Sequence, residues 1–221
     1  MLFNLLILLF FFISSIASSH QLISTCMTDP KIQEARSREL AELLSLDQKE
    51  REHFNNKMTP NEISRSVMND LARRKRVGEI MAEGCFKTAA DYTAASLIYQ
   101  HGDVPTHYYL AFIWANQAIA LGDEKQKKLA AMTIDRYLIS IGKKQIFGTQ
   151  YYAENVAEGC FCLQPVEHSF PESRRIEYIG KKLADQYNAL LELNNKKINC
   201  SVAECLIQLS ASPRGTIVGF W

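Results

Sequence analysis

Helix start and stop signals recur at short intervals through the middle of this chain, and they constrain its fold more than any other feature. Thr59-Pro60-Asn61-Glu62 combines an N-cap threonine, a proline in the first helical position and a glutamate suited to a capping box. Further starts fall at Thr88, Thr106 and Asp123, and stops fall at Gly84, Gly122 and Gly142. Because only short loops separate these signals, we expect consecutive helices to pack as antiparallel neighbours.

Apolar residues spaced three and four apart support the same interpretation. They predict helices over residues 31–55, from Pro60 onward, after Thr106, over 173–193 and, as a short helix, over 201–209; the helix from Pro60 carries Ile63, Val67, Met68 and Leu71 on one face. The helix after Thr106 is apolar around much of its circumference, which predicts a central, buried position. The sequence therefore predicts an all-α fold. It should be an antiparallel helical bundle or helical-hairpin array of about six to seven helices, with an irregular cysteine-containing segment near residues 145–171.

The N-terminus has the features of a secretory signal peptide. An apolar run from Leu5 to Ile13 is followed by small residues that include Ala17, and it is shorter than the roughly 20 residues that a membrane span needs. We predict a signal peptide over residues 1–18 and a single helical domain over 19–221, exported to the periplasm or secreted, with no membrane span after cleavage. An uncleaved anchor and lipidation of Cys26 are the alternatives.

Six cysteines follow the predicted signal peptide, and an even number in an exported chain favours disulfides. The disulfide candidates are Cys26, Cys85, Cys160, Cys162, Cys200 and Cys205. Cys160 and Cys162 lie too close in sequence to pair with each other, whereas Cys200 and Cys205 could close a small loop. Cys160, Cys162 and His168 carry metal-ligating side chains, but a fourth ligand at suitable spacing is missing, so no metal site is predicted.

The charge balance argues against a nucleic-acid partner. Lys and Arg number 25 against 24 Asp and Glu, giving a net charge of +1, which provides no field for holding a phosphate backbone. The basic run Arg73–Arg76 would fan around a helix, as is typical of a solvated face. Lys125, Lys127 and Lys128 form a looser group whose charge the two preceding carboxylates offset. No nucleophile-elbow, zinc-protease or phosphate-loop motif is present, and no cofactor is predicted.

Short polar phrases follow one another in a fixed order. They are Asp47-Gln48-x-x-Arg51, Asp70 with Arg73-Arg74, Asp91-Tyr92-x-Ala94-Ala95, Gln100-His101-Gly102, Asp135-Arg136-Tyr137-Leu138, and Gly142 and Gln145 leading to Phe147-Gly148-Thr149-Gln150. This set resembles a bacterial family of mostly exported helical proteins whose biochemical role is uncharacterised. The resemblance covers about residues 38–152 and leaves a cysteine-rich C-terminal extension over 153–221. It implies a helical fold and export, without a reaction.

A second resemblance is looser. The helix over Tyr109–Ala120, followed by Leu121-Gly122, is similar to the helix pairs of tetratricopeptide repeats that close on glycine. No period repeats three times along the chain, as an independent repeat array requires.

The polar residues of the family-like phrases are the candidates for a ligand site or a polar network: Asp47, Arg51, Asp91, Gln100, His101, Asp135, Arg136, Gln145 and Gln150. Buried charges must pair, because a lone one is costly. One interpretation is a structural network in which Arg136 pairs with Asp47 or Asp91. The other is a polar pocket in which His101 acts as acid or base, an aspartate orients it and Arg136 holds an anion.

The sequence contains no complete catalytic constellation, so we expect a non-catalytic protein of the cell envelope that binds a protein partner or a small-molecule ligand. The alternatives are an envelope hydrolase that uses His101 with Asp91 or Asp135, and a tetratricopeptide-like interaction module. A hydrolase would need His101 within about 3 Å of a carboxylate and open to a cleft.

The signal-peptide prediction is tested by the mass of the exported protein. Since small residues follow a short apolar core, cleavage should leave a mature N-terminus at Ser18 or Ser19. Mass spectrometry of N-terminal peptides should find one of these ends. Exported protein that retains Met1 would show that the leader is not removed.

Overall fold

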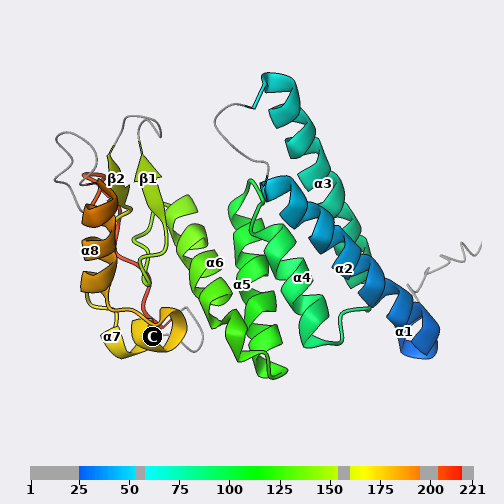
Figure 1. Ribbon diagram of the computed structural model, residues 1–221. Helices are drawn as coiled ribbons and strands as arrows, with labels where there is room; N and C mark the ends of the chain where they lie inside the picture. The colour runs from blue at the N-terminus through cyan, green and yellow to red at the C-terminus, as the bar shows by residue number, and fades with distance from the viewer. Residues whose placement is uncertain (1–24, 53–57, 154–159, 195–203, 216–221) are drawn as a thin grey trace, which may run out of the picture.

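The computed structural model describes residues 25–52, 58–153, 160–194 and 204–215 (Figure 1). The predicted signal peptide over 1–18 lies outside these residues. Along the chain the elements are α1 (Thr25–Thr28), α2 (Pro30–Glu52), α3 (Pro60–Ala82), α4 (Ala89–Tyr99), α5 (Pro105–Ala120), a 3-10 turn η1 (Glu124–Gln126), α6 (Lys127–Ser140), β1 (Tyr151–Ala153), β2 (Phe161–Leu163), α7 (Glu172–Ile179) and α8 (Leu183–Asn194).

The helices α2 to α6 form a stack, and the hairpin β1–β2 with α7 and α8 lies beyond its α6 end (Figure 1). Within the stack α2 packs on α4, α4 on α5 and α5 on α6, while α7 packs against α6. The two strands form a short antiparallel pair in which Tyr151 faces Leu163. The predicted all-α fold is therefore confirmed for the described residues, with an irregular segment between α6 and α7 that contains the hairpin.

Capping boxes form at two of the predicted helix starts, Thr59 and Thr88. The Thr59 hydroxyl accepts a hydrogen bond from the Glu62 amide at 3.3 Å, and the Glu62 carboxylate accepts one from the Thr59 amide at 2.8 Å. Thr88 and Asp91 repeat this exchange at 3.2 and 2.9 Å. These reciprocal bonds satisfy amides that have no partner inside the helix, so they define where α3 and α4 begin. The start predicted at Thr106 is displaced, because Pro105 already occupies the first turn of α5.

Two predictions near the C-terminus are wrong. The single helix predicted over 173–193 is divided into α7 and α8, because Gly180 adopts φ 70° and ends α7 in the left-handed conformation. Within the predicted helix over 201–209, residues 204–209 are extended, and residues 201–203 lie outside the described residues. The Cys205 amide donates to the Leu163 carbonyl, which draws this segment alongside β2.

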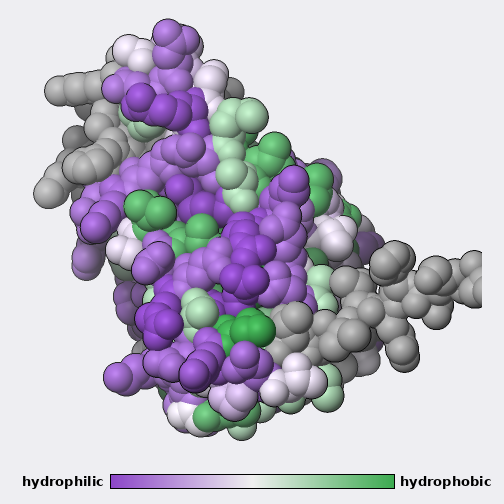
Figure 2. Space-filling view, turned by 90° about the vertical axis from the view of Figure 1, so that its right-hand side faces the viewer, coloured by the Kyte–Doolittle hydropathy of each residue, from purple (hydrophilic) through white to green (hydrophobic). Residues whose placement is uncertain are grey.

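The apolar face predicted for the first half of α3 is exposed. Ile63, Val67, Met68 and Leu71 keep 44%, 56%, 62% and 52% of their surface in solvent. In Figure 1 this half of α3 projects beyond the other helices, so no described element covers it. The same end of the molecule is largely hydrophilic with separate hydrophobic patches (Figure 2). None of the helices in the described ranges is long and apolar enough to cross a membrane.

Helix α5 connects the two larger hydrophobic clusters of the core. Trp114 and Ala111 pack with residues of α2, α3 and α4, while Phe112 and Ala115 pack with α6 and the loop that follows it. All four are buried. The predicted central position of this helix is confirmed, because its side chains contribute to both clusters.

Disulfides join distant segments. Cys26 pairs with Cys85, and Cys162 pairs with Cys205, with Cα–Cα distances of 5.2 and 5.0 Å. Cys160 is disulfide-bonded as well, and Cys200 lies outside the described residues. The prediction that Cys160 and Cys162 do not pair with each other is confirmed, and the alternative of a Cys200–Cys205 loop is wrong. The Cys162–Cys205 bond fixes the C-terminal segment beside β2.

A single buried carboxylate shapes the loop after α6. Asp135 is completely buried, and its side chain accepts hydrogen bonds from the amides of Ile146, Phe147 and Thr149 at 2.8–2.9 Å and from the Thr149 hydroxyl at 2.9 Å. Burial raises the pKa of Asp135, while these four donors favour its charged form. The family-like phrase Phe147–Gln150 is thus folded around the aspartate of the preceding phrase.

Asp135→Asn tests this arrangement. The asparagine amide would place its N–H hydrogens against backbone N–H groups that also donate. We therefore expect the free energy of unfolding to fall by about 3 kcal/mol, the cost of leaving buried hydrogen-bonding groups without partners. Urea denaturation at pH 7 measures it. Asp123→Asn is the control, since Asp123 accepts one side-chain bond from Gln126; equal, small losses in both variants would contradict the role of Asp135.

Candidate functional site

The first group of predicted residues meets where α2, α3 and the turn after α4 come together. Asp47 is completely buried, and the Nδ1 atom of His101 lies 3.0 Å from its Oδ2 atom. Arg51 and Arg73 each place a guanidinium nitrogen 3.5 Å from Oδ1. We call these four residues with Asp70 and Glu50 the Asp47 network, because Asp70 contacts both arginines and Glu50 contacts Arg73, each at 2.5 Å.

The charges of the Asp47 network stabilise its buried carboxylate. Burial acts to raise the pKa of Asp47, but the hydrogen bond and charge of His101, with the charges of Arg51 and Arg73, outweigh it and hold that pKa below its usual value. Asp47 therefore stays ionised near neutral pH and links α2 to α3 and to the turn that follows α4.

The interpretation of Arg73–Arg76 as a solvated face is wrong. Arg73 and Arg74 are 7% and 5% exposed. Arg74 donates to the His101 carbonyl at 3.1 Å, and Arg76 donates to both oxygens of Glu39 on α2 at 2.5 and 3.0 Å. Arg73, Arg74 and Arg76 face carboxylates and carbonyls of neighbouring elements and hold α3 in the stack, whereas Lys75 is exposed.

Neither aspartate predicted to orient His101 contacts it. The Asp91 carboxylate accepts from the amides of Lys87 and Thr88 at the start of α4, and Asp135 faces the loop after α6. Asp47 is the carboxylate beside His101. The imidazole is 21% exposed, so it is largely covered by its neighbours.

Arg136 has different partners from those predicted. Its Nη1 atom donates to the Gln100 carbonyl at 2.5 Å and its Nε atom to the Gln150 side chain at 3.3 Å, and it lies over the Tyr108 ring. No carboxylate of the described residues pairs with it. Burial lowers the pKa of Arg136, and the charge of Arg51 acts in the same direction. Arg136 ties the end of α4 to the loop after α6 through neutral acceptors.

Two of the three predicted glutamines, Gln145 and Gln150, belong to the same loop. Gln145 is completely buried; its amide group donates to the carbonyls of Gln150 and Gln164, and its side-chain oxygen accepts from the Gln150 amide. Gln150 donates to the Met132 carbonyl. The Gln145 side chain satisfies loop backbone, as the structural interpretation expects, whereas the Gln150 side chain joins the loop to α6.

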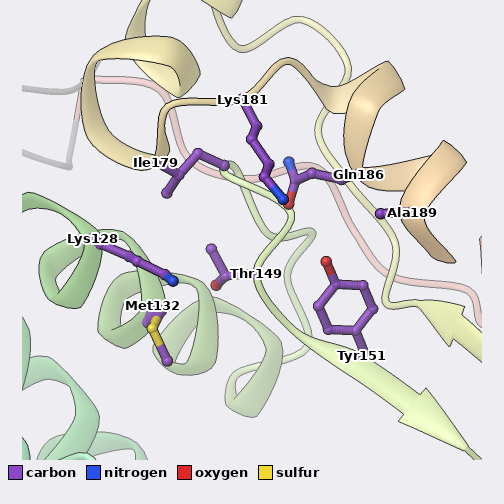
Figure 3. Close-up of a pocket in the computed structure, with 8 residues that line it drawn as sticks. All are labelled: Lys128, Met132, Thr149, Tyr151, Ile179, Lys181, Gln186 and Ala189. Atoms are coloured by element: carbon purple, nitrogen blue, oxygen red, sulfur yellow. The ribbon is translucent and has the colours of Figure 1, made fainter. Parts of the chain in front are cut away.

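A cavity of about 290 Å³ opens beside this loop, between α6, β1 and the start of α8 (Figure 3). Its walls combine three apolar side chains with polar groups of both neutral and basic character: Met132, Ile179 and Ala189 are apolar, Thr149, Tyr151 and Gln186 are neutral and polar, and Lys128 and Lys181 are basic. We call it the lysine pocket. Figure 3 shows the Lys128 and Lys181 side chains reaching into it from opposite elements, with the Tyr151 hydroxyl directed toward the same space.

The lysine pocket has an unbalanced charge. Neither Lys128 nor Lys181 forms an ion pair with any of the described residues, and no described lining residue is a carboxylate. Burial raises the pKa of Tyr151, and the Asp135 charge adds to this, so its hydroxyl stays a neutral donor. An anion in the pocket would thus meet two ammonium groups and further hydrogen-bond donors.

The lysine pocket was not predicted from the sequence. Lys128 was grouped with Lys127, whose ammonium does pair with Glu124 and Glu177, at 2.7 and 3.4 Å. One residue further along α6 the side chain points about 100° away, toward the loop. Lys181 belongs to a segment predicted as continuous helix, and only the break at Gly180 brings it to the pocket.

Comparisons with family models, with curated proteins and with solved structures found no match to this chain. Membership in the resembled family therefore stays a prediction. The described residues contain no group of three or more His, Cys, Asp or Glu side chains that could hold a metal ion.

Asp47→Asn tests the electrostatic account of the network. Since the pKa of Asp47 is lower in the folded chain than its usual 3.8, its stabilisation is present above that value and is lost as pH falls through the folded pKa. We expect the variant to lose about 3 kcal/mol at pH 7 and the difference from wild type to shrink below about pH 4.

Chemical denaturation at both pH values measures this difference. The exposed carboxylate Glu42, on the same helix, provides the control as Glu42→Gln, for which no comparable loss is expected. A loss that is independent of pH would mean that Asp47 acts through shape and not through charge.

Proposed function

We propose that this protein is an exported, non-catalytic binding protein that takes a small organic anion into the lysine pocket. The observation that carries the proposal is the pair of basic side chains, Lys128 and Lys181, which enter one cavity and have no ion-pair partner among the described residues. Ammonium groups facing a concave, partly apolar site attract an anion by charge and orient it by hydrogen bonds.

The size and lining of the lysine pocket favour a small ligand. Its volume of about 290 Å³ is at the lower end of the roughly 300–1,000 Å³ found for ligand sites. Met132 and Ile179 offer apolar contact, whereas Thr149 and Gln186 offer polar contact. Thr149 and Gln186 are held by hydrogen bonds to Asp135 and to the Phe147 carbonyl, so the pocket is largely ordered before a ligand arrives.

Export is part of the proposal and rests on two features. The chain begins with an apolar run of signal-peptide length, and Cys26–Cys85 and Cys162–Cys205 are disulfides, which persist in oxidising compartments.

The two alternatives have less support. The contact of 3.0 Å between His101 and Asp47 has the geometry of a catalytic pair, but Asp47 is shared with two arginines and the imidazole is largely covered, which suits a structural network better. The stacked helices suit a tetratricopeptide-like module, yet no described groove indicates which peptide it would take.

Lys181→Met and Lys128→Met test the proposal. Each keeps an aliphatic stem and removes one charge, so each should weaken the binding of butyrate or benzoate about tenfold, and the double variant should abolish it. Calorimetric titration measures the dissociation constants. The matched controls are Lys182→Met and Lys125→Met, whose exposed side chains do not line the pocket. Equal weakening by controls and pocket variants, or no binding by wild type, would overturn the proposal.

A further inference from the structure

We infer that the anion taken by the lysine pocket carries a single apolar tail, as a free medium-chain carboxylate does, and that this tail lies in an adjoining groove. The inference rests on the proposed function and adds the chemical class of the ligand. The groove is lined by Tyr151, Phe161, Ala189, Leu190 and Leu193, and its volume is about 280 Å³.

The groove and the lysine pocket adjoin each other. Tyr151 and Ala189 line both of them, so the apolar surface begins where the polar lining ends. Figure 3 shows the Tyr151 hydroxyl directed toward the lysine side of this boundary. A molecule that crosses the boundary must therefore be charged at one end and apolar at the other.

The groove itself offers only apolar contacts. Phe161 lies on β2, whereas Ala189, Leu190 and Leu193 lie on one face of α8 at helical spacing. Leu193 is 53% exposed and Tyr151 is 47% exposed, so part of this surface stays in water when the groove is empty. An acyl chain along it would remove apolar area from water, which favours binding.

A carboxylate with one chain fits this arrangement better than a membrane lipid does. The groove beside the head pocket has a volume of about 280 Å³ and the head pocket one of about 290 Å³, whereas a diacyl lipid would need room for two chains and a larger head group. The Tyr151 hydroxyl, the Gln186 side-chain amide and the two lysine ammonium groups around the head pocket can donate hydrogen bonds to the two oxygens of a carboxylate.

The experiment compares butyrate, hexanoate and octanoate with octanol by calorimetric titration of the full-length mature protein. Each fully buried methylene tightens the dissociation constant about fourfold. In a half-open groove we expect octanoate to bind about 10- to 100-fold more tightly than butyrate. Octanol should bind more weakly than octanoate, because it lacks the charge that the lysines hold.

Leu193→Ser is the groove variant, and Leu46→Ser is its matched control. Leu46 has a similar exposure, 57% against 53%, and lies on α2 at the other end of the stack. Because Leu193 is half exposed, its replacement should leave the fold intact. It should weaken octanoate binding about fivefold and leave butyrate binding unchanged, whereas Leu46→Ser should change neither.

The possible results separate the two proposals. Lysine-dependent binding that is equally tight for butyrate and octanoate would overturn the tail and leave the proposed function standing. Binding that grows with chain length but ignores the lysine substitutions would overturn both. Sedimentation with phosphatidylglycerol vesicles is the third arm: vesicle binding that requires both Leu193 and Lys181 would assign the site to a bilayer and overturn the free carboxylate.

Discussion

The charge of Asp135 and the four donors around it are the interaction on which the candidate site depends. The loop after α6 makes no regular helix or strand before β1, so its backbone amides need partners elsewhere. Asp135 supplies them from inside the protein, from within helix α6, which is itself fixed by packing against α5. Burying a carboxylate is costly, and here each contact to it is also a contact that shapes the loop. As a result, the loop connects the helical stack rigidly to the hairpin β1–β2.

The same loop is held from its other side by a second buried charge. Arg175 of α7 is completely buried and donates to the Ile146, Phe170 and Glu167 carbonyls at 2.8–2.9 Å, as well as to Glu172. Gly148 adopts φ 81°, and a Cβ atom there would lie 3.0 Å from the Gln186 amide nitrogen, so a side chain would displace the residue that lines the lysine pocket. The aspartate, the arginine and the glycine act on one short segment. Their combined effect is to place Thr149 and Gln186 before any ligand binds.

Local signals in the sequence predict much of the fold, and the site depends on contacts that such signals do not contain. The helix starts at Thr59 and Thr88 depend on only four consecutive residues each, and both predictions are confirmed. The helix break at Gly180 is also local, but an apolar stripe that continues on both sides of it conceals it. By contrast, the burial of Arg73 depends on α2, more than twenty residues earlier in the chain, and the carbonyl partner of Arg136 comes from α4. Lys128 and Lys181 meet only because α7 turns the chain back toward α6. Pattern and propensity predict which segments are helical, and the tertiary fold decides which charges meet.

The Asp47 network and the lysine pocket differ in whether their charged side chains have partners within the fold. This difference distinguishes a structural network from a candidate binding site. In the Asp47 network every arginine faces a carboxylate, so its guanidinium charges are paired within the fold. Beside the lysine pocket, the buried carboxylate of Asp135 contacts the lining residue Thr149 and is already occupied by the four donors of the loop. If Asp135 turned toward the ammonium groups, it would lose its hydrogen bonds to backbone amides. Leaving those buried amides without partners is more unfavourable than an exposed ion pair is stabilising. The interaction that builds the loop therefore also leaves Lys128 and Lys181 without a counter-ion among the described residues, and the proposal of an anionic ligand rests on this feature.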